Sequence, residues 1–391
     1  MDFAWSSDME LMRDELRAFA RRFPASYWRE KEATQTFPSE YWKALGEAGW
    51  LAALVPEEYG GSGLGPVEMV LITEELVAGG IGGTGGTLLI ANLVFGTMSI
   101  LHHGNEEQKA RFMPMMSDGE SVFAMALTEP DAGSNTPELT TYARRDGDGW
   151  RLNGRKVWST NFERAPVALI LCRTTPQDKV ARKTDGLSTF LVENPAGREG
   201  VEVRPIDKHG LSALTSNEVF FDNVRLDQSE LLGEEGQGWK QILKVLNPER
   251  MVGAAVSVGL GRLAIQAAVK YANERHVFGR PIGANQSISF PLAECAAQLE
   301  AASLLNYKAA WLFSQNLPCA GEVNMAKYLA TEACWKACDW AVQVHGGFGY
   351  AKEYDVERYM REARLHRIAP VSSQMALNFI SEHVLGLPRS Y

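Results

Sequence analysis

Cysteine is scarce in this 391-residue sequence, and its few cysteines form no recognisable pairs. The five cysteines include no Cys-x-x-Cys motif, and an odd count without such motifs predicts free thiols in a reducing compartment. Cys334 and Cys338 share a helix face at i, i+4 spacing, but no histidine or second cysteine pair stands at ligand spacing. We therefore expect these two thiols to pack in a core and the chain to bind no metal.

Long apolar runs and an excess of positive charge are also missing. No run of about 18 consecutive apolar residues is evident, so we expect no membrane-spanning segment. The N-terminus carries acidic residues at helical spacing and lacks the features of a signal or transit peptide, which predicts a cytoplasmic location. The net charge of −9 and the pI near 5.5 argue against nucleic acid as the main partner.

Hydrophobic periodicity divides the chain into three parts. The length exceeds what one ordinary core needs. Apolar residues recur at helical spacing up to about residue 120, as at Met9, Met12, Leu16 and Phe19, and period-two strand patterns follow. Helical spacing then returns to the end of the chain. We therefore predict an α+β protein with a helical domain at 1–120, a β-domain at 121–232 and a second helical domain at 233–391.

The stretch from Met125 to Asn161 has the most distinctive local pattern. A strand-like run ends at Thr128-Glu129-Pro130, and a loop of small residues around Gly133 would let an electron-rich ligand approach free backbone N–H groups. Asp-Gly pairs predict a tight turn, after which a second strand leads to Trp158 and Thr160. An indole face and a hydroxyl at a strand end suit a planar aromatic ligand with polar edges. The simpler alternative is a β-hairpin with a core tryptophan.

The motifs Thr-Glu-Pro-x-Ala-Gly-Ser (128–134) and Trp-x-Thr-Asn (158–161) resemble the flavin-binding signature of the acyl-CoA dehydrogenases, and the resemblance extends over essentially the whole chain. It implies a fold of an N-terminal helical domain, a β-barrel or sandwich and a C-terminal four-helix bundle, with FAD as cofactor. Thr160 would lie near the flavin nitrogen that accepts hydride, and Ser134 between flavin and acyl-CoA. The residues that the resemblance assigns to the flavin here are Met125, Leu127, Thr128, Gly133, Ser134, Trp158, Ser159 and Thr160.

Further family motifs imply a flavin site shared between subunits of a homodimer or homotetramer. Arg275, Phe278 and Gln286 match the segment that contacts the neighbouring subunit's FAD. Gln343, Gly346 and Gly347 match a motif whose glycines admit the dinucleotide, and Ser372 and Gln374 stand where two further FAD contacts are found. Each alone could be a surface cation or a helix cap, whereas together they follow the order and spacing of the family.

Glu249 is the candidate catalytic base. Removing a proton alpha to a thioester needs a carboxylate in a dry site. The commoner family position for this carboxylate holds Pro370 here, but an alternative position, in a Leu-x-x-Glu-Arg stretch, holds Glu249. The resemblance also puts Asn247 and Arg250 near the substrate. Pro248 suggests that Glu249 lies in a first helical turn, where a surface pair with Arg250 is the competing explanation.

Two local features bear on how substrate is held. Proline has no N–H, so Pro370 cannot donate to the thioester oxygen as the family residue does. Either Val371 donates instead or a flavin hydroxyl acts alone. Glycine-rich residues 79–86 interrupt a helical pattern, which favours a flexible connection; the alternative is that their missing side chains leave room for an acyl group.

The predicted function is FAD-dependent α,β-desaturation of an acyl-CoA in fatty or branched acyl-CoA catabolism, with an electron-transfer flavoprotein as acceptor. Other flavin chemistry within the superfamily stays open, namely an acyl-CoA oxidase, a desulfinase or a flavin monooxygenase. A flavin-binding subunit without turnover is the third possibility.

Overall fold

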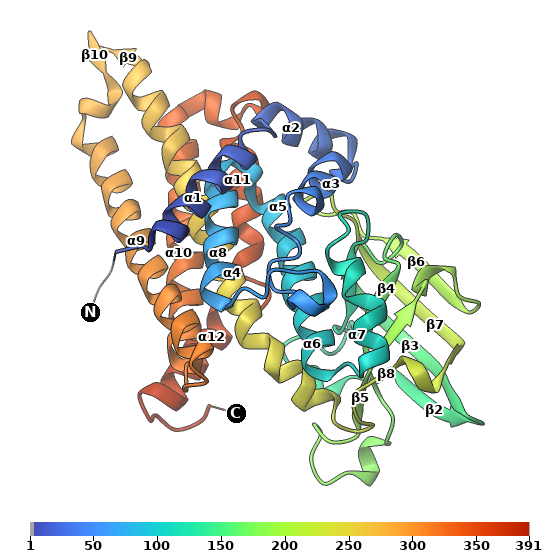
Figure 1. The fold of residues 1–391 in the computed structure, drawn as a ribbon. Helices are drawn as coiled ribbons and strands as arrows, with labels where there is room; N and C mark the ends of the chain where they lie inside the picture. Colours follow the sequence, from blue (N-terminus) through green and yellow to red (C-terminus); the bar gives the residue numbers. More distant parts are fainter. Residues whose placement is uncertain (1–3, 391) are drawn as a thin grey trace.

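The computed structural model describes residues 4–390, with helices first, strands second and helices again at the end (Figure 1). This order confirms the predicted α+β class. Two π-helical segments, Val77–Ile81 and Ile90–Met98, join α4, α5 and α6 end to end. The helices of the first region are α1 Ser7–Ala20, α2 Ala25–Thr34, α3 Ser39–Glu47, α4 Pro66–Leu76, α5 Gly82–Leu89, α6 Ser99–His103 and α7 Glu106–Phe112.

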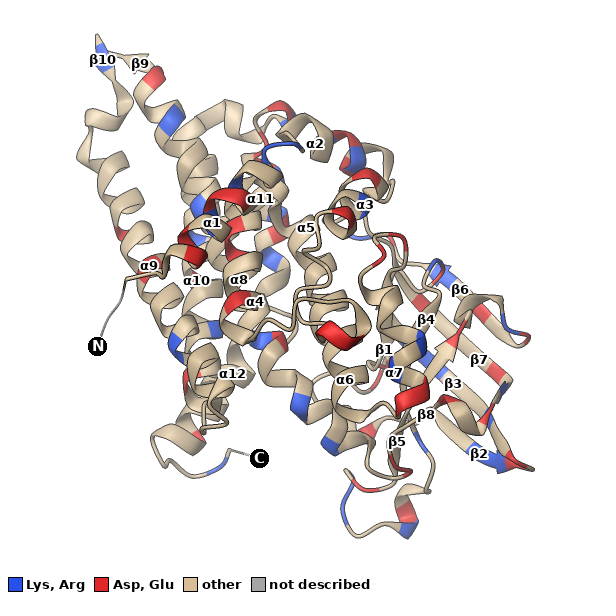
Figure 2. Ribbon diagram, viewed as in Figure 1, with Lys and Arg blue, Asp and Glu red and all other residues tan. Residues whose placement is uncertain are grey.

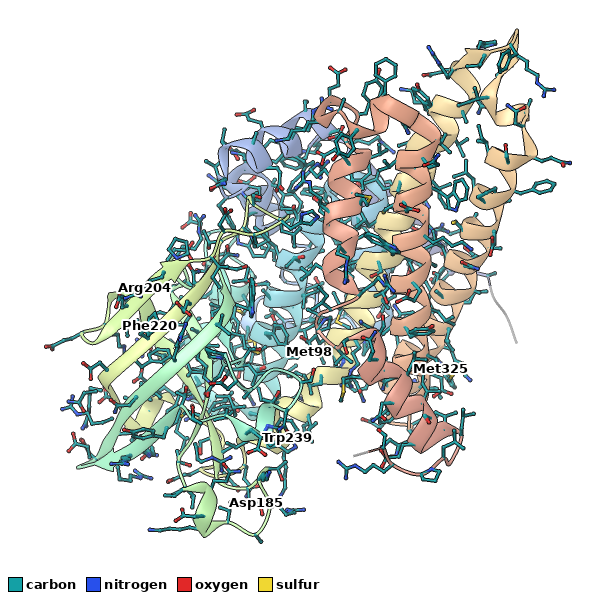
Figure 3. All side chains as sticks on the ribbon, turned by 180° about the vertical axis from the view of Figure 1, so that it is seen from behind. Met98, Asp185, Arg204, Phe220, Trp239 and Met325 are labelled. Atoms are coloured by element: carbon teal, nitrogen blue, oxygen red, sulfur yellow. The ribbon has the colours of Figure 1, made fainter. Side chains whose placement is uncertain are left out.

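The middle region forms an eight-stranded sheet in the order β6-β7-β3-β2-β4-β5-β8, with β1 paired parallel to β4. The predicted tight turn joins β2 to β3, where Asp146 pairs with Gly149 and Gly147 has a φ of +63°. In Figure 3, Arg204 and Phe220 mark the edge pair β6–β7. The strands are β1 Phe123–Ala126, β2 Tyr142–Asp146, β3 Gly149–Thr160, β4 Val167–Arg173, β5 Leu187–Glu193, β6 Val201–Pro205, β7 Ser216–Leu226 and β8 Leu231–Leu232.

The third region is a helical bundle built on one long helix, α8. A short hairpin of β9 His276–Val277 and β10 Arg280–Pro281 follows α8 and projects from the end of the bundle away from the sheet (Figure 1). The helices are α8 Gly238–Glu274, α9 Gln286–Ser314, α10 Ala320–His345, α11 Val356–His366 and α12 Ser373–Phe379.

An apolar core joins the sheet to the helices. Leu169 of β4 and Leu187 of β5 belong to the same buried cluster as Ile100 of α6, Phe112 of α7 and Ile242 of α8. Trp239, at the start of α8, packs against this cluster and lies between sheet and bundle in Figure 3. Lys, Arg, Asp and Glu are interspersed over the helices and the sheet in the view of Figure 2. The start of α8 is therefore packed against both the first helical region and the sheet.

Two helical stretches, Pro66–His103 and Gly238–Glu274, are long and apolar enough to cross a membrane by length and composition alone. Sequence reasoning, which found no apolar run of this length, did not recognise these two stretches. Their most apolar windows are 83% and 67% buried inside the structure, as expected of core helices, and such helices are weak evidence for a membrane. The absence of a membrane span stays a prediction.

Residues 79–86 are mostly packed and not a loose connection. Their helical backbone is kinked at Gly80, which has a φ of +133° and open space where a Cβ would stand. Most of the other glycines lie against other parts of the chain. A Cβ on Gly79 would lie 2.6 Å from Cβ of Ala20, and one on Gly86 would lie 2.8 Å from Cγ2 of Val256. Gly83 approaches Glu362, whose carboxylate accepts a 2.9 Å hydrogen bond from the Gly83 N–H. The glycines therefore allow close packing of backbone against α1, α8 and α11.

Replacing Gly86 with alanine should destabilise the protein by about 1–3 kcal/mol, because the added methyl group overfills a packed core. Gly253→Ala is the matched control within a helix. Its Cβ would lie 3.5 Å from Cδ of Pro370, which is ordinary contact, and alanine in a helix interior gains about 0.5–1 kcal/mol. Urea unfolding would measure both. Equal stabilities for the two variants would contradict this packing.

Candidate active site

A buried ion pair fixes the loop that follows β1. Nζ of Lys156 lies 2.9 Å from both Oε1 of Glu129 and the carbonyl oxygen of Leu127. Glu129 also accepts hydrogen bonds from the N–H groups of Thr140 and Thr141, at 2.6 and 2.9 Å. Burial alone would raise the pKa of Glu129, but Lys156 and these hydrogen bonds lower it to about 2. The loop is thus tied to both β2 and β3.

This ion pair brings the predicted flavin residues of β1 and β3 together. The Val157 N–H donates to the Thr128 carbonyl at 2.9 Å, which joins the loop to β3 directly. Met125, Leu127 and Thr128 are partly buried, whereas Gly133 and Ser134 are exposed. Sequence reasoning missed Lys156. The only available signal was a lysine in the alternating pattern of β3 where an inward-facing residue was expected.

Trp158 is presented to solvent by an irregular end of β3. Its side chain is 55% exposed, so the alternative of a core tryptophan is wrong for this residue; Trp150 is the buried one. Trp158 has a φ of +63° and Asn161 a φ of +56°, and the register between β3 and β7 shifts between Lys156 and Ser159. Left-handed backbone at a non-glycine residue stores strain, and such strain concentrates at ligand sites.

Polar atoms beside Trp158 lack partners. Oγ of Ser159 and Nδ2 of Asn161 are buried without a hydrogen bond to any protein atom in the described part of the chain. A buried polar atom without a partner is costly. The Thr160 side chain is half-buried on the same strand end. The exposed indole and the unpartnered polar atoms fit a planar ligand with polar edges.

Glu249 lies in the interior of α8, eleven residues after Gly238, and not in a first turn as Pro248 had suggested. Only 6% of its surface is exposed. Within residues 4–390, its carboxylate accepts no hydrogen bond and forms no ion pair within 4 Å. The proposed pair with Arg250 is therefore wrong, because Arg250 instead donates from Nη1 to Oδ1 of Asn247 at 3.0 Å.

The surroundings of Glu249 favour its neutral form. Burial raises its pKa to about 8, against the opposing influence of Arg250 and of Lys327 on α10. A carboxyl group with a pKa near the working pH, without a hydrogen-bond donor, is suited to accept a proton from a bound molecule. This is the physical property that the predicted base requires.

Pro370 packs against α8 at Gly253, one helical turn after Glu249. A Cβ on Gly253 would be 3.5 Å from Cδ of Pro370, and Gly253 follows Glu249 by four residues on α8. Lys327 is fully buried beneath this loop and donates to the carbonyl oxygens of His366, at 2.9 Å, and of Val371. Sequence reasoning did not identify Lys327, since a single lysine in a helix gives no signal for its carbonyl partners.

The predicted flavin residues of the β9–β10 hairpin lie away from the sheet that carries Trp158. Figure 1 shows the β9–β10 hairpin, with Phe278 at its tip, at the far end of the bundle from the sheet. Phe278 is fully exposed with a φ of +52°. Arg275, Gln286, Gln343, Gly346, Gly347 and Gln374 are exposed, and Ser372 begins α12 by accepting a hydrogen bond from the Met375 N–H at 3.2 Å.

The glycines of the exposed group have room for a ligand at their backbone. No atom lies within 4 Å of a Cβ built on Gly133, Gly346 or Gly347. Together with the unpartnered Ser159 and Asn161 atoms, these open backbone positions fit the dinucleotide that the motifs imply. No group of three or more His, Cys, Asp or Glu side chains that could hold a metal occurs among residues 4–390, and all five cysteines are free and buried.

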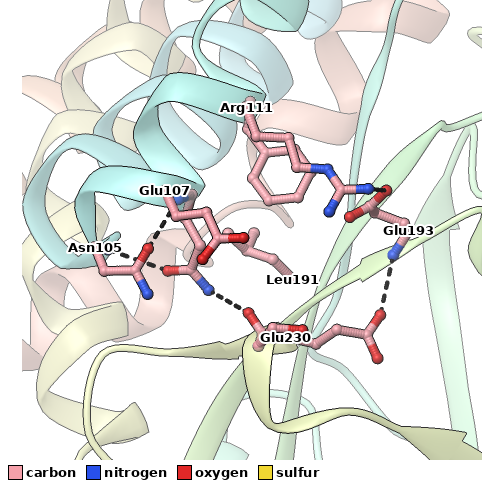
Figure 4. A pocket seen from close by; sticks show the side chains of 9 residues that line it. Asn105, Glu107, Arg111, Leu191, Glu193 and Glu230 are labelled. Atoms are coloured by element: carbon pink, nitrogen blue, oxygen red, sulfur yellow. Dashed lines mark hydrogen bonds and ion pairs between the residues drawn. The ribbon is translucent and has the colours of Figure 1, made fainter.

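A separate small pocket between α7 and the sheet is not part of this site (Figure 4). Its polar side chains bind one another: Arg111 pairs with Glu193, and Nε2 of Gln108 donates to the Ser229 carbonyl at 2.9 Å. The Glu193 N–H also donates to Glu230, at 3.4 Å. These contacts attach α7 to the sheet.

Lys156→Met should destabilise the protein by about 3–5 kcal/mol, because it leaves the Glu129 carboxylate buried without its counter-ion. It should also loosen the loop at Leu127–Glu129 and lower the flavin content of the purified protein. The double variant Lys156→Met, Glu129→Gln removes the uncompensated charge and should recover part of the stability. Thermal unfolding and the ratio of flavin to protein absorbance measure both effects. Unchanged stability in Lys156→Met would contradict this role.

Comparisons with known proteins agree with this geometry. Residues 6–120, 124–224 and 236–385 match, respectively, the N-terminal, middle and C-terminal domains of acyl-CoA dehydrogenases. The acyl-CoA dehydrogenase FadE12 of Mycobacterium tuberculosis is 39% identical over 391 residues, which is 100% of this chain and 99% of the relative.

Solved structures share the fold over the whole chain. The glutaryl-CoA dehydrogenase–glutaryl-CoA complex has a TM-score of 0.93 at 32% identity and covers 100% of this chain and 98% of that one. A structure from work on the electron transferring flavoprotein of Acidaminococcus fermentans also has a TM-score of 0.93, at 33% identity, covering 98% and 100%. The chain therefore belongs to the acyl-CoA dehydrogenase family of FAD-dependent oxidoreductases, which desaturate acyl-CoA thioesters between the α and β carbons.

Proposed function

We propose that Glu249 is the base that removes the α-proton of the acyl-CoA in this enzyme. The observation that supports it is the burial of the Glu249 carboxyl group without any donor in residues 4–390, one helical turn from the loop at Pro370. Pro370 has no ionisable group, so the commoner family position cannot carry the base. Asn247 and Arg250, joined by their own hydrogen bond, would border the substrate next to Glu249.

Each residue has a defined part in this reaction. Bound FAD supplies the hydride acceptor for the substrate's β-carbon. Trp158 and Thr160 would flank the flavin ring. The buried Ser159 hydroxyl, which has no protein partner, would form a hydrogen bond with the flavin. Met125 to Ser134 would contact the ring edge through backbone groups and the Thr128 hydroxyl. Glu249 takes the α-proton and becomes neutral, the form that its buried position favours.

The assembly and the electron acceptor are further parts of the proposal. Arg275, Phe278 and Gln286 would contact the FAD of a neighbouring subunit, with Gln343, Gly346, Gly347, Ser372 and Gln374 completing the site, in a homodimer or homotetramer. Exposed apolar side chains on the bundle, including Phe278 and Tyr350 at 101% and 88% exposure, support such contacts. We further propose an electron-transfer flavoprotein as acceptor, a cytoplasmic location and domains at 1–120, 121–232 and 233–391.

Glu249→Gln should lower kcat/KM by about 10²–10⁴-fold, the usual contribution of a general base. The measurement is anaerobic flavin bleaching with a panel of butyryl-, isovaleryl-, glutaryl- and phenylpropanoyl-CoA. Full bleaching by the variant, with FAD retained, would refute the assignment. Oxygen consumption without an added acceptor would indicate an oxidase or monooxygenase, and a wild-type flavin that no acyl-CoA bleaches would indicate a subunit without turnover.

The pH dependence of kcat/KM gives a second test of Glu249. With a pKa near 8, the free enzyme holds this carboxyl mostly protonated at pH 7, so kcat/KM should rise as pH increases from 6 to about 8. Because the pKa of Glu249 is raised in the folded state, its contribution to stability is fully present below its ordinary pKa of 4.5. That contribution is lost as pH rises towards 8. Glu249→Gln should therefore be at least as stable as the wild type at pH 8, which separates lost catalysis from unfolding.

Arg275→Ala should release FAD without unfolding the chain, because Arg275 is exposed and forms no ion pair within residues 4–390. Arg280→Ala, in the same hairpin, is the control for loss of a nearby cation; its Nη2 donates to Asn285 at 2.8 Å. Native mass and flavin content would be measured together. Wild-type flavin content in Arg275→Ala, or a native mass equal to the 43.1 kDa chain, would contradict the shared site.

A further inference from the structure

Lys327 fastens the loop between α11 and α12 at both ends. Its Nζ donates to the His366 carbonyl, at 2.9 Å, and to the Val371 carbonyl. His366 is the last residue of α11, and Val371 stands two residues before α12. The Lys327 side chain is fully buried. A buried ammonium group needs hydrogen-bond acceptors such as these two carbonyl oxygens, because desolvation without them is costly.

The fastened loop faces the proposed base. Pro370, which the two Lys327 contacts enclose, packs against Gly253 on the turn of α8 after Glu249. Glu332, five residues after Lys327 on α10, binds residues at both ends of the same loop. It accepts from Nε of Arg367 at 2.8 Å and from Oγ of Ser373 at 2.7 Å. The position of the Val371 peptide is therefore determined by α10.

Most N–H groups of this loop already have acceptors, but that of Val371 does not. The Ile368 and Ala369 N–H groups donate to the Leu365 carbonyl at 2.8 and 2.9 Å, and the Ser373 N–H donates to Arg367 at 3.1 Å. Pro370 has no N–H at all. In the described chain, Val371 is the first residue after Pro370 whose N–H remains without a protein acceptor; the Ser372 N–H is the next.

We propose that Lys327 is a positioning residue that fixes the loop so that the Val371 N–H donates to the thioester oxygen, in place of the donor that Pro370 cannot supply. This inference rests on the proposed function, since it places the thioester beside Glu249. Negative charge develops on that oxygen as the α-proton leaves. A donor already held in place at that point lowers the barrier without reorganisation.

Charge at Lys327 contributes as well. The charged and titratable groups around Lys327 are Glu249 and Arg250 on α8, Glu332 on its own helix α10, and His366 on α11. Burial lowers the pKa of Lys327 to about 8 and, together with the Lys327 charge, that of His366 to about 4. His366 is therefore neutral at neutral pH, and Lys327 is the nearby cation on α10 that favours the ionised form of Glu249.

The first test removes only the Val371 N–H, by replacing Val371 with its α-hydroxy acid so that an ester replaces the amide. The Val371 carbonyl that Lys327 holds is unchanged. Loss of one such donor lowers kcat by about 10²–10³-fold in other enzymes, and we expect a loss of this size with little change in KM. The same replacement at Ile368, whose N–H is already bonded to Leu365, should lower the unfolding temperature and not kcat.

Two results would overturn this assignment. One is wild-type kcat in the Val371 ester, and the other is a loss of activity in a Ser372 ester but not in the Val371 ester. Both are measured with the acyl-CoA of the panel that bleaches the wild-type flavin fastest. If Glu249→Gln is inactive while the Val371 ester is fully active, the donor fails and the base stands. If Glu249→Gln is fully active, the proposed function itself fails.

The second test is Lys327→Met, with Lys336→Met on the same helix as control. Lys336 is partly exposed and pairs with Glu294 at 2.6 Å, away from the site. Lys327→Met should lower kcat by at least tenfold and move the rise of kcat/KM to higher pH, because a cation facing Glu249 is lost. Lys336→Met should do neither. Lower stability of Lys327→Met with an unshifted pH profile would show a merely structural lysine and contradict the positioning role.

Discussion

A carboxyl group without a hydrogen-bond donor, buried in the middle of a long helix, is the constraint on which the account of this enzyme depends. Burying an ionisable group in this way costs stability, and Glu249 is buried with no donor in residues 4–390. Other buried carboxylates of the chain show the contrast. Glu129 is bound by Lys156, and Glu362 accepts from Gly83, Thr84 and Arg358. The unbound carboxyl group is the one available to a substrate.

The fold maintains this environment by surrounding the first half of α8. The sheet and the first helices pack against one side through a shared apolar core. Ala330 of α10 packs with Ala254 of α8, and the loop before α12 covers Gly253 through Pro370. Glycines in residues 79–86 let the neighbouring helical backbone approach α8 closely. The end of β3 has the opposite property, an exposed indole at Trp158 on strained backbone. The ion pair of Lys156 and Glu129 holds the neighbouring loop to this strand.

Sequence patterns predicted the order of helices and strands and the hairpin that leads to Trp158, because hydrophobic periodicity and Asp-Gly turns are local signals. Motif spacing indicated Glu249 but not its surroundings. Pro248 was misleading, since the helix continues through it, and the glycines of 79–86 resembled a loose connection because their packing partners are distant in sequence. Lys327 bonds carbonyl groups 39 and 44 residues away, which no local pattern reveals.

The position of the Glu249 carboxylate relative to a bound acyl-CoA is the measurement that tests the central claim most directly. A crystal structure of the enzyme with FAD and an acyl-CoA should place a carboxylate oxygen of Glu249 within about 3–3.5 Å of the substrate's α-carbon, the reacting distance of a near-attack geometry. The flavin ring should lie on the opposite face of the acyl chain. A Glu249 side chain directed away from the α-carbon, with another carboxylate or a water-filled gap beside it, would contradict the account.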